Sequence, residues 1–168
     1  MPDSDGTNGS HFLWAIGGFA FASWLLRRQI DESKKSRAEM DDPDGAEEIY
    51  NEIKELLHEW EPEGFDSEDD YMKDLAEYLE EYSDWAIEVC PNTSEGKPDI
   101  VIGDLLALEL KLTPSKGECD RAVGQCAGYS REWMTWLVLI DTNVTQVGRI
   151  ENLLQDKGLE QIEVWSFS

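Results

Sequence analysis

Apolar residues follow two different spacings along the chain. In residues 46–60 and 67–82 they recur every three or four positions, which predicts two amphipathic helices. Ser67 is a favourable N-cap for the second of these helices, because acidic residues follow it. The predicted apolar faces consist of Ile49, Ile53, Leu56, Leu57 and Trp60 in the first helix, and of Tyr71, Leu75, Tyr78, Leu79 and Tyr82 in the second.

After residue 84 the apolar residues form short or alternating runs, which are typical of β-strands. These runs predict strands over residues 85–90, 98–102, 106–112, 136–140 and 162–167. Helical spacing returns in residues 118–132 and 145–156. From residue 67 the order is therefore αβββαβαβ, which indicates an α/β fold.

The length of 168 residues suits one domain with a short appendage. We expect a disordered polar stretch at residues 1–10, a hydrophobic helix at 11–28, a polar linker at 29–45 and an α/β domain at 46–168.

The hydrophobic segment is the uncharged run FLWAIGGFAFASWLL at residues 12–26. It is shorter than the roughly 20 residues that usually span a bilayer, but Arg27 and Arg28 follow it at once. This positive flank predicts a membrane anchor with the C-terminal domain in the cytoplasm. A buried or interfacial helix in a soluble cytoplasmic protein and a cleaved signal peptide are the alternatives, although the flank before the run is acidic rather than basic.

Charge is strongly biased towards acids. The chain has 37 acidic and 14 basic residues, a net charge of −23, and residues 39–88 alone hold 21 acids and two bases. A carboxylate-rich surface keeps a protein hydrated in molar salt, and this composition resembles that of proteins from salt-loving archaea and their viruses. The alternative is an ordinary solvated acidic helix face.

Cysteine and histidine are sparse. The three cysteines include no CxxC pair, and the only histidines are His11 and His58. A disulfide scaffold is therefore excluded, and a Cys/His zinc site is disfavoured.

Three charged residues in the predicted strands combine into a candidate site. Glu109 and Lys111 are two positions apart on one strand and therefore point to the same face. If Gly103–Leu105 forms a three-residue connection, Asp99 lies opposite Glu109 with Cβ atoms about 5 Å apart. A two-residue turn would place the two acids on opposite faces. The alternative is that Glu109 and Lys111 are an ordinary solvent-facing pair.

Two ionised carboxylates at this range repel each other, and a divalent cation with a preference for oxygen ligands relieves that repulsion. Asp99 and Glu109 are therefore the predicted ligands of Mg²⁺, with Mn²⁺ as a substitute. Such an ion can polarise a phosphoryl oxygen and activate a water, and Lys111 can offset the developing charge. Phosphodiester hydrolysis uses all of these parts.

The segment PDIVIGDLLALELK at residues 98–111 resembles the motif of the PD-(D/E)xK nuclease superfamily. Residues 125–129 (QCAGY) are similar to the QxxxY element of its RecB-like members. The resemblance covers residues 68–141 and implies a restriction-endonuclease-like αβββαβ core with a mixed central sheet, here preceded by the hydrophobic helix and the acidic amphipathic helix. By position it implies Asp99 and Glu109 as metal ligands, Lys111 as the catalytic lysine, and Gln125 and Tyr129 as residues that shape the site.

The chain departs from that family on the first helix of the core. Met72 stands where members often carry an acid, and Asp70 and Asp74 are the neighbouring candidates for that role.

The sequence thus predicts a membrane-tethered, Mg²⁺-dependent DNA endonuclease. A catalytically inactive nuclease-like module that binds DNA or a partner at the membrane is the alternative. A third hypothesis is an interaction protein whose acidic helices contact a basic partner. A homodimer is compatible with each of them.

Overall fold

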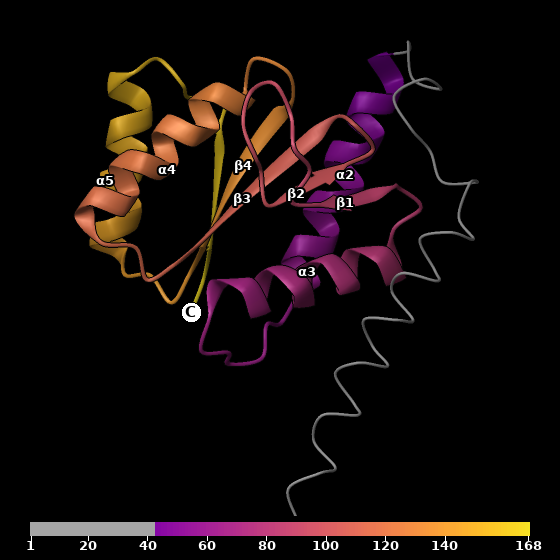
Figure 1. The fold of residues 1–168 in the computed structure, drawn as a ribbon, viewed down its shortest axis with the longest axis horizontal. Helices are drawn as coiled ribbons and strands as arrows, with labels where there is room; N and C mark the ends of the chain where they lie inside the picture. The colour runs from indigo at the N-terminus through magenta and orange to yellow at the C-terminus, as the bar shows by residue number, and fades with distance from the viewer. Residues whose placement is uncertain (1–42) are drawn as a thin grey trace, which may run out of the picture. The chain divides into compact units, whose positions relative to one another are not determined.

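The computed structural model describes residues 43–168, which form a mixed five-stranded sheet and four helices (Figure 1). The predictions for residues 1–10, 11–28 and most of the linker lie outside the described residues. The elements are α2 (Pro43–Glu59), α3 (Glu68–Tyr82), β1 (Ile87–Val89), β2 (Ile100–Ile102), β3 (Leu106–Leu112), α4 (Lys116–Tyr129), β4 (Met134–Ile140), α5 (Val144–Asp156) and β5 (Glu163–Phe167). The predicted α/β class and the element order from residue 67 are confirmed.

The strands lie in the order β1-β2-β3-β4-β5. Strand β2 is antiparallel to both β1 and β3, whereas β3, β4 and β5 run parallel to one another. The crossovers between parallel strands pass through α4 and α5, as parallel pairing requires. Strand β3 is therefore the central strand, where the antiparallel and parallel halves of the sheet meet.

Helices cover both faces of the sheet (Figure 1). Helices α2 and α3 pack with Leu108 and Leu110 of β3 and Val138 of β4 in one buried cluster. Helices α4 and α5 pack with Leu137 and Leu139 in a second cluster on the opposite face. This division follows from the alternation of side chains along a strand.

The boundaries of the two N-terminal helices differ slightly from the prediction. Helix α2 is described from Pro43, three residues before the predicted start. Ser67 caps α3 as predicted and accepts a hydrogen bond from the Asp70 N–H. Tyr82, which was predicted to lie on the apolar face of α3, is 58 % exposed because the helix ends there.

Candidate active site

The hairpin between β2 and β3 sets the position of the candidate residues. Residues 103–105 connect the two strands, and the Leu105 N–H donates to the Ile102 carbonyl at 3.0 Å. The ladder pairs Ile100 with Leu108, so its extension by one residue places Asp99 beside Glu109. The connection therefore has the three-residue length that the sequence argument requires.

Gly103 is needed in this turn for two reasons. Its φ of +57° lies in the left-handed region, which side chains disfavour. A Cβ at this position would also lie 2.8 Å from Cε3 of Trp85, which is fully buried. Glycine thus permits both the turn and the close packing beneath it.

Glu109 and Lys111 lie on the face of β3 that α4 covers. The side chain of Glu109 is 1 % exposed and that of Lys111 is 13 % exposed, and Glu109 Oε1 lies 2.9 Å from Lys111 Nζ. The alternative of a solvent-facing pair is therefore wrong. It fails because β3 is central and both of its faces are covered, so that Tyr129 of α4 packs over Ala107 in the same row.

Asp99 is fixed against the backbone of β3. Its Oδ2 accepts a hydrogen bond from the Leu110 N–H at 2.7 Å. Burial raises the pKa of Asp99, while this hydrogen bond and the nearby charge of Lys111 act in the opposite direction. The carboxylate is thus held in place but is costly to ionise without a further cation.

The ionised form of the Glu109 carboxyl group is unfavourable in this site. Burial and the neighbouring charge of Asp99 raise the pKa of Glu109 to about 7, although Lys111 lowers it. Its second oxygen, Oε2, is buried and has no hydrogen-bond partner among the residues from Pro43 to Ser168. A buried carboxylate oxygen without a partner is unfavourable, and it can act as a ligand to a cation.

Lys111 is surrounded by acids. Burial lowers the pKa of Lys111, but the carboxylates of Glu109, Asp99 and Glu68 more than compensate, and the pKa lies well above its usual range. The lysine is therefore a permanent positive charge beside the two carboxylates.

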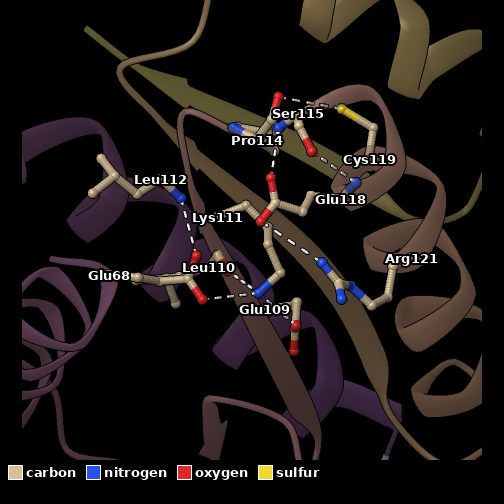
Figure 2. Close-up of polar contacts among 10 residues, drawn as sticks. All are labelled: Glu68, Glu109, Leu110, Lys111, Leu112, Pro114, Ser115, Glu118, Cys119 and Arg121. Carbon is tan, nitrogen blue, oxygen red and sulfur yellow. Dashed lines mark hydrogen bonds and ion pairs between the residues drawn. The ribbon is translucent and has the colours of Figure 1, made fainter.

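Sequence reasoning missed Glu68, the first residue of α3 (Figure 2). Its Oε1 lies 3.0 Å from Lys111 Nζ, and its Oε2 accepts a hydrogen bond from the Leu112 N–H at 3.1 Å. Glu68 thus joins the amino end of α3 to the last residues of β3. The available signal was the Ser67 cap, which marks Glu68 as a first-turn residue but does not say what that turn contacts.

The acids that the sequence suggested for the helix position have other partners. Asp70 accepts a hydrogen bond from Ser67 Oγ at 2.6 Å, and Asp74 accepts one from the indole N–H of Trp60 at 2.9 Å. Met72 is buried, and its sulfur lies 3.5 Å from Cys90 Sγ. The acid of α3 that contacts Lys111 is therefore Glu68.

Helix α4 brings Gln125 and Tyr129 to the same cluster. Ser115 and Glu118 form a capping box that fixes the start of this helix (Figure 2). Tyr129 is buried, and burial together with the charge of Glu109 raises the pKa of Tyr129 to about 12, while a hydrogen bond with Gln125 lowers it. Tyr129 is thus close enough to Glu109 and Asp99 for their charges to raise its pKa, and Gln125 joins the site through its hydrogen bond with Tyr129. Asp99 directly precedes β2, Glu109 and Lys111 are on β3, and Gln125 and Tyr129 are on α4.

The donor set suits a hard cation with few protein ligands. Asp99 and Glu109 supply oxygen atoms, which Mg²⁺ and Mn²⁺ prefer, and Mg²⁺ commonly binds through one or two carboxylates with water or phosphate in its other positions. Among residues 43–168 no group of three or more His, Cys, Asp or Glu side chains is arranged to hold a metal ion. The unpartnered Glu109 Oε2 is the atom that fits such an ion best.

A cleft of about 360 Å³ lies away from these residues, at the start of β4 and β5. Its lining includes Tyr50, Arg131, Trp136 and Glu163 but none of the five predicted residues. The charged cluster and this cleft are thus separate features of the fold.

Comparison with known proteins returned no matching family model, no matching curated protein and no matching solved structure. In the part of the chain from Pro43 onwards, no helix has the length and apolar character needed to cross a bilayer. The predicted anchor at residues 12–26 lies outside the described residues.

Proposed function

We propose that this protein is a metal-dependent DNA endonuclease of the PD-(D/E)xK type. The observation that carries the proposal is the co-facial group of buried Glu109 with half-buried Asp99 and Lys111, in which Glu109 Oε2 has no hydrogen-bond partner among residues 43–168. Paired buried carboxylates beside a buried lysine are costly to maintain for stability alone. Groups with strongly shifted pKa values cluster at functional sites.

Each residue has a defined role in this proposal. Asp99 and Glu109 would hold Mg²⁺, and the ion would supply the Lewis acidity that polarises a phosphoryl oxygen and activates a water. Lys111 keeps its proton and stabilises the negative charge that develops on the phosphate. Gln125 holds the Tyr129 hydroxyl, and the pair closes the α4 side of the site.

The fold and the local charge support the nuclease assignment. The order αβββαβ over α3 to β4, around a mixed sheet, is the arrangement expected of a restriction-endonuclease-like core. Residues 98–131 hold five acids and four bases in a chain of net charge −23. The surroundings of the site are therefore nearly neutral, which favours the approach of DNA from this side over the acidic α2 and α3 side.

The direct test is cleavage of supercoiled, linear and branched DNA by the purified chain, with Mg²⁺, with Mn²⁺ and with EDTA at molar KCl. We expect nicking only with the metal, and we expect Asp99→Asn and Glu109→Gln to reduce it by at least about a hundredfold, since both remove a metal ligand. Asp104→Asn is the matched control, because Asp104 is exposed in the neighbouring turn. Equal cleavage by all three variants would exclude the proposed site.

A catalytically inactive nuclease-like module is the second candidate. It is favoured by Met72, which is buried against Cys90 at the position where members of the PD-(D/E)xK superfamily often carry an acid. Such a module would retain DNA in a salt-dependent manner with no cleavage in either metal. The same cleavage experiment, paired with a binding measurement, separates the two functions.

A further inference from the structure

All of the hydrogen-bonding capacity of Lys111 is used within the protein. Its ammonium group has three donors. Nζ lies 2.9 Å from Glu109 Oε1, 3.0 Å from Glu68 Oε1 and 2.5 Å from the Leu110 carbonyl oxygen. In this arrangement the lysine divides its charge between two carboxylates, one on its own strand and one on α3.

This arrangement creates a competition at Glu109. A divalent ion on Glu109 Oε2 would lie close to the ammonium group that occupies Oε1 of the same carboxylate. Two positive charges at that range repel strongly in a buried site. The ion therefore binds best if the ammonium group has another anion to hold it.

Glu68 meets that requirement. Its backbone is fixed by the Ser67 cap, and its second oxygen is bonded to the Leu112 N–H, so the carboxylate stays in place whether or not Lys111 contacts Glu109. The side chain of Glu68 is 40 % exposed, whereas that of Glu109 is 1 % exposed. The negative charge of Glu68 is therefore less costly to maintain, and Glu68 can hold Lys111 while Glu109 binds a cation.

We propose that Glu68 is a positioning residue that holds the Lys111 ammonium group at the end of β3, so that Glu109 is free to bind a metal ion. Glu68 does not bind the metal itself. Its whole effect on the metal passes through Lys111. This inference rests on the proposed metal-dependent function, because it concerns the same pair of carboxylates.

The test is a double-mutant cycle of Mn²⁺ affinity, measured by titration calorimetry on the full chain without DNA. We expect Glu68→Gln to weaken Mn²⁺ binding by about fivefold or more, because Lys111 then stays on Glu109. We expect Lys111→Met to tighten binding, because the competing cation is gone. In the Lys111→Met background Glu68→Gln should then change the affinity by less than about twofold.

The controls separate this role from two simpler ones. Asp70→Asn removes a charge from the same helical turn but not from Lys111, and should leave Mn²⁺ affinity near the wild-type value. If Glu68→Gln weakens binding equally with and without Lys111, Glu68 acts on the metal directly and the proposal is overturned. Lys111→Gln replaces Lys111→Met if the methionine variant does not fold.

Unfolding of the metal-free protein gives an independent arm. Glu68→Gln should lower the Tm when Lys111 is present and should not lower it in the Lys111→Met background. An equal decrease in both backgrounds overturns the proposal. If the wild-type chain binds no Mn²⁺, the proposed metal-dependent function fails, and this arm alone decides whether Glu68 acts by holding Lys111.

Discussion

The carboxyl group of Glu109 is buried, and its ionised form is energetically unfavourable there. Its pKa is raised from an ordinary 4.5 to about 7, chiefly by burial and then by the charge of Asp99. Below about pH 4.5 Glu109 is protonated in both the folded and the unfolded chain, so it imposes no cost on folding. Between pH 4.5 and 7 the unfolded chain releases this proton while the folded chain retains it.

The free energy of unfolding of the metal-free protein should therefore decrease as pH rises through this window. The loss of stability caused by Glu109 amounts to about 3 kcal/mol and is complete above pH 7. Glu109→Gln should remove that pH dependence and be the more stable protein at pH 8. Urea unfolding in EDTA at pH 5 and pH 8 measures both effects.

Asp104→Asn is the control for this measurement, since Asp104 is exposed and should leave the pH dependence unchanged. If Glu109→Gln loses stability between pH 5 and 8 as steeply as the wild type does, the carboxyl group of Glu109 is not the source of the effect.

At the residue scale, the sequence predicts which site residues lie near one another only when those residues are close along the chain. Glu109 and Lys111 share a face because they are two positions apart on a strand, and Asp99 joins them through a short turn. Glu68 is 43 residues from Lys111, and only the packing of α3 against the sheet brings the two together. An N-cap signal locates the start of a helix, but it does not identify the strand end that the helix meets.

At the scale of single elements, the β2–β3 turn controls the geometry of the site. Gly103→Ala forces a side chain into a left-handed backbone conformation and towards Cε3 of Trp85 at 2.8 Å. We expect a loss of about 2 kcal/mol or more in the free energy of unfolding, from the backbone conformation and the overpacking together. Cleavage should fall further than stability explains, because Asp99 depends on this turn to lie beside Glu109.

Gly124→Ala is a matched control in α4. A Cβ there meets no other atom of the described part of the chain within 4 Å, so alanine should raise the free energy of unfolding by up to about 1 kcal/mol. Urea unfolding of both variants provides the comparison, and a Gly103→Ala protein as stable as the wild type would show that the turn tolerates a side chain.

Element order was predictable because the apolar spacing changes from helical to alternating at residue 84. The sequence left open which face of β3 is buried. Leu106, Leu108, Leu110 and Leu112 suggest one apolar face and one polar face, yet Ala107 and Glu109 are also buried. Burial of both faces is a property of a central strand, which becomes evident only when the neighbours and the covering helices are known.

At the scale of the whole molecule, we predict that residues 12–26 attach the protein to a membrane. The apolar run and the arginines that follow it favour an N-terminus outside the cell and the α/β domain in the cytoplasm. The full chain should remain in the membrane pellet after carbonate extraction, and Ser4→Cys should be labelled from outside the cell. Full-length protein that stays monodisperse without detergent would contradict the anchor.

The net charge of −23 leads to a second prediction at this scale. The acids on α2 and α3 repel one another across the exposed side of these helices, and this repulsion extends over only about 3 Å in 1 M salt but over about 10 Å at 0.1 M. We therefore expect the Tm to rise clearly between about 0.1 and 2 M KCl, because screening stabilises the compact state more than the expanded one.

Glu77 and Glu81 give this prediction a local test, because both are exposed and they lie four residues apart on α3. Like charges at this spacing destabilise a helix by about 0.2–0.5 kcal/mol, and salt weakens the effect. The double variant Glu77→Gln/Glu81→Gln should melt at a higher temperature than the wild type in low salt and at nearly the same temperature at 2 M KCl. If the Tm difference between the double variant and the wild type is the same at every KCl concentration, repulsion between these two acids is not its source. A wild-type Tm that does not change with KCl would remove the argument that this surface is adapted to a concentrated salt solution.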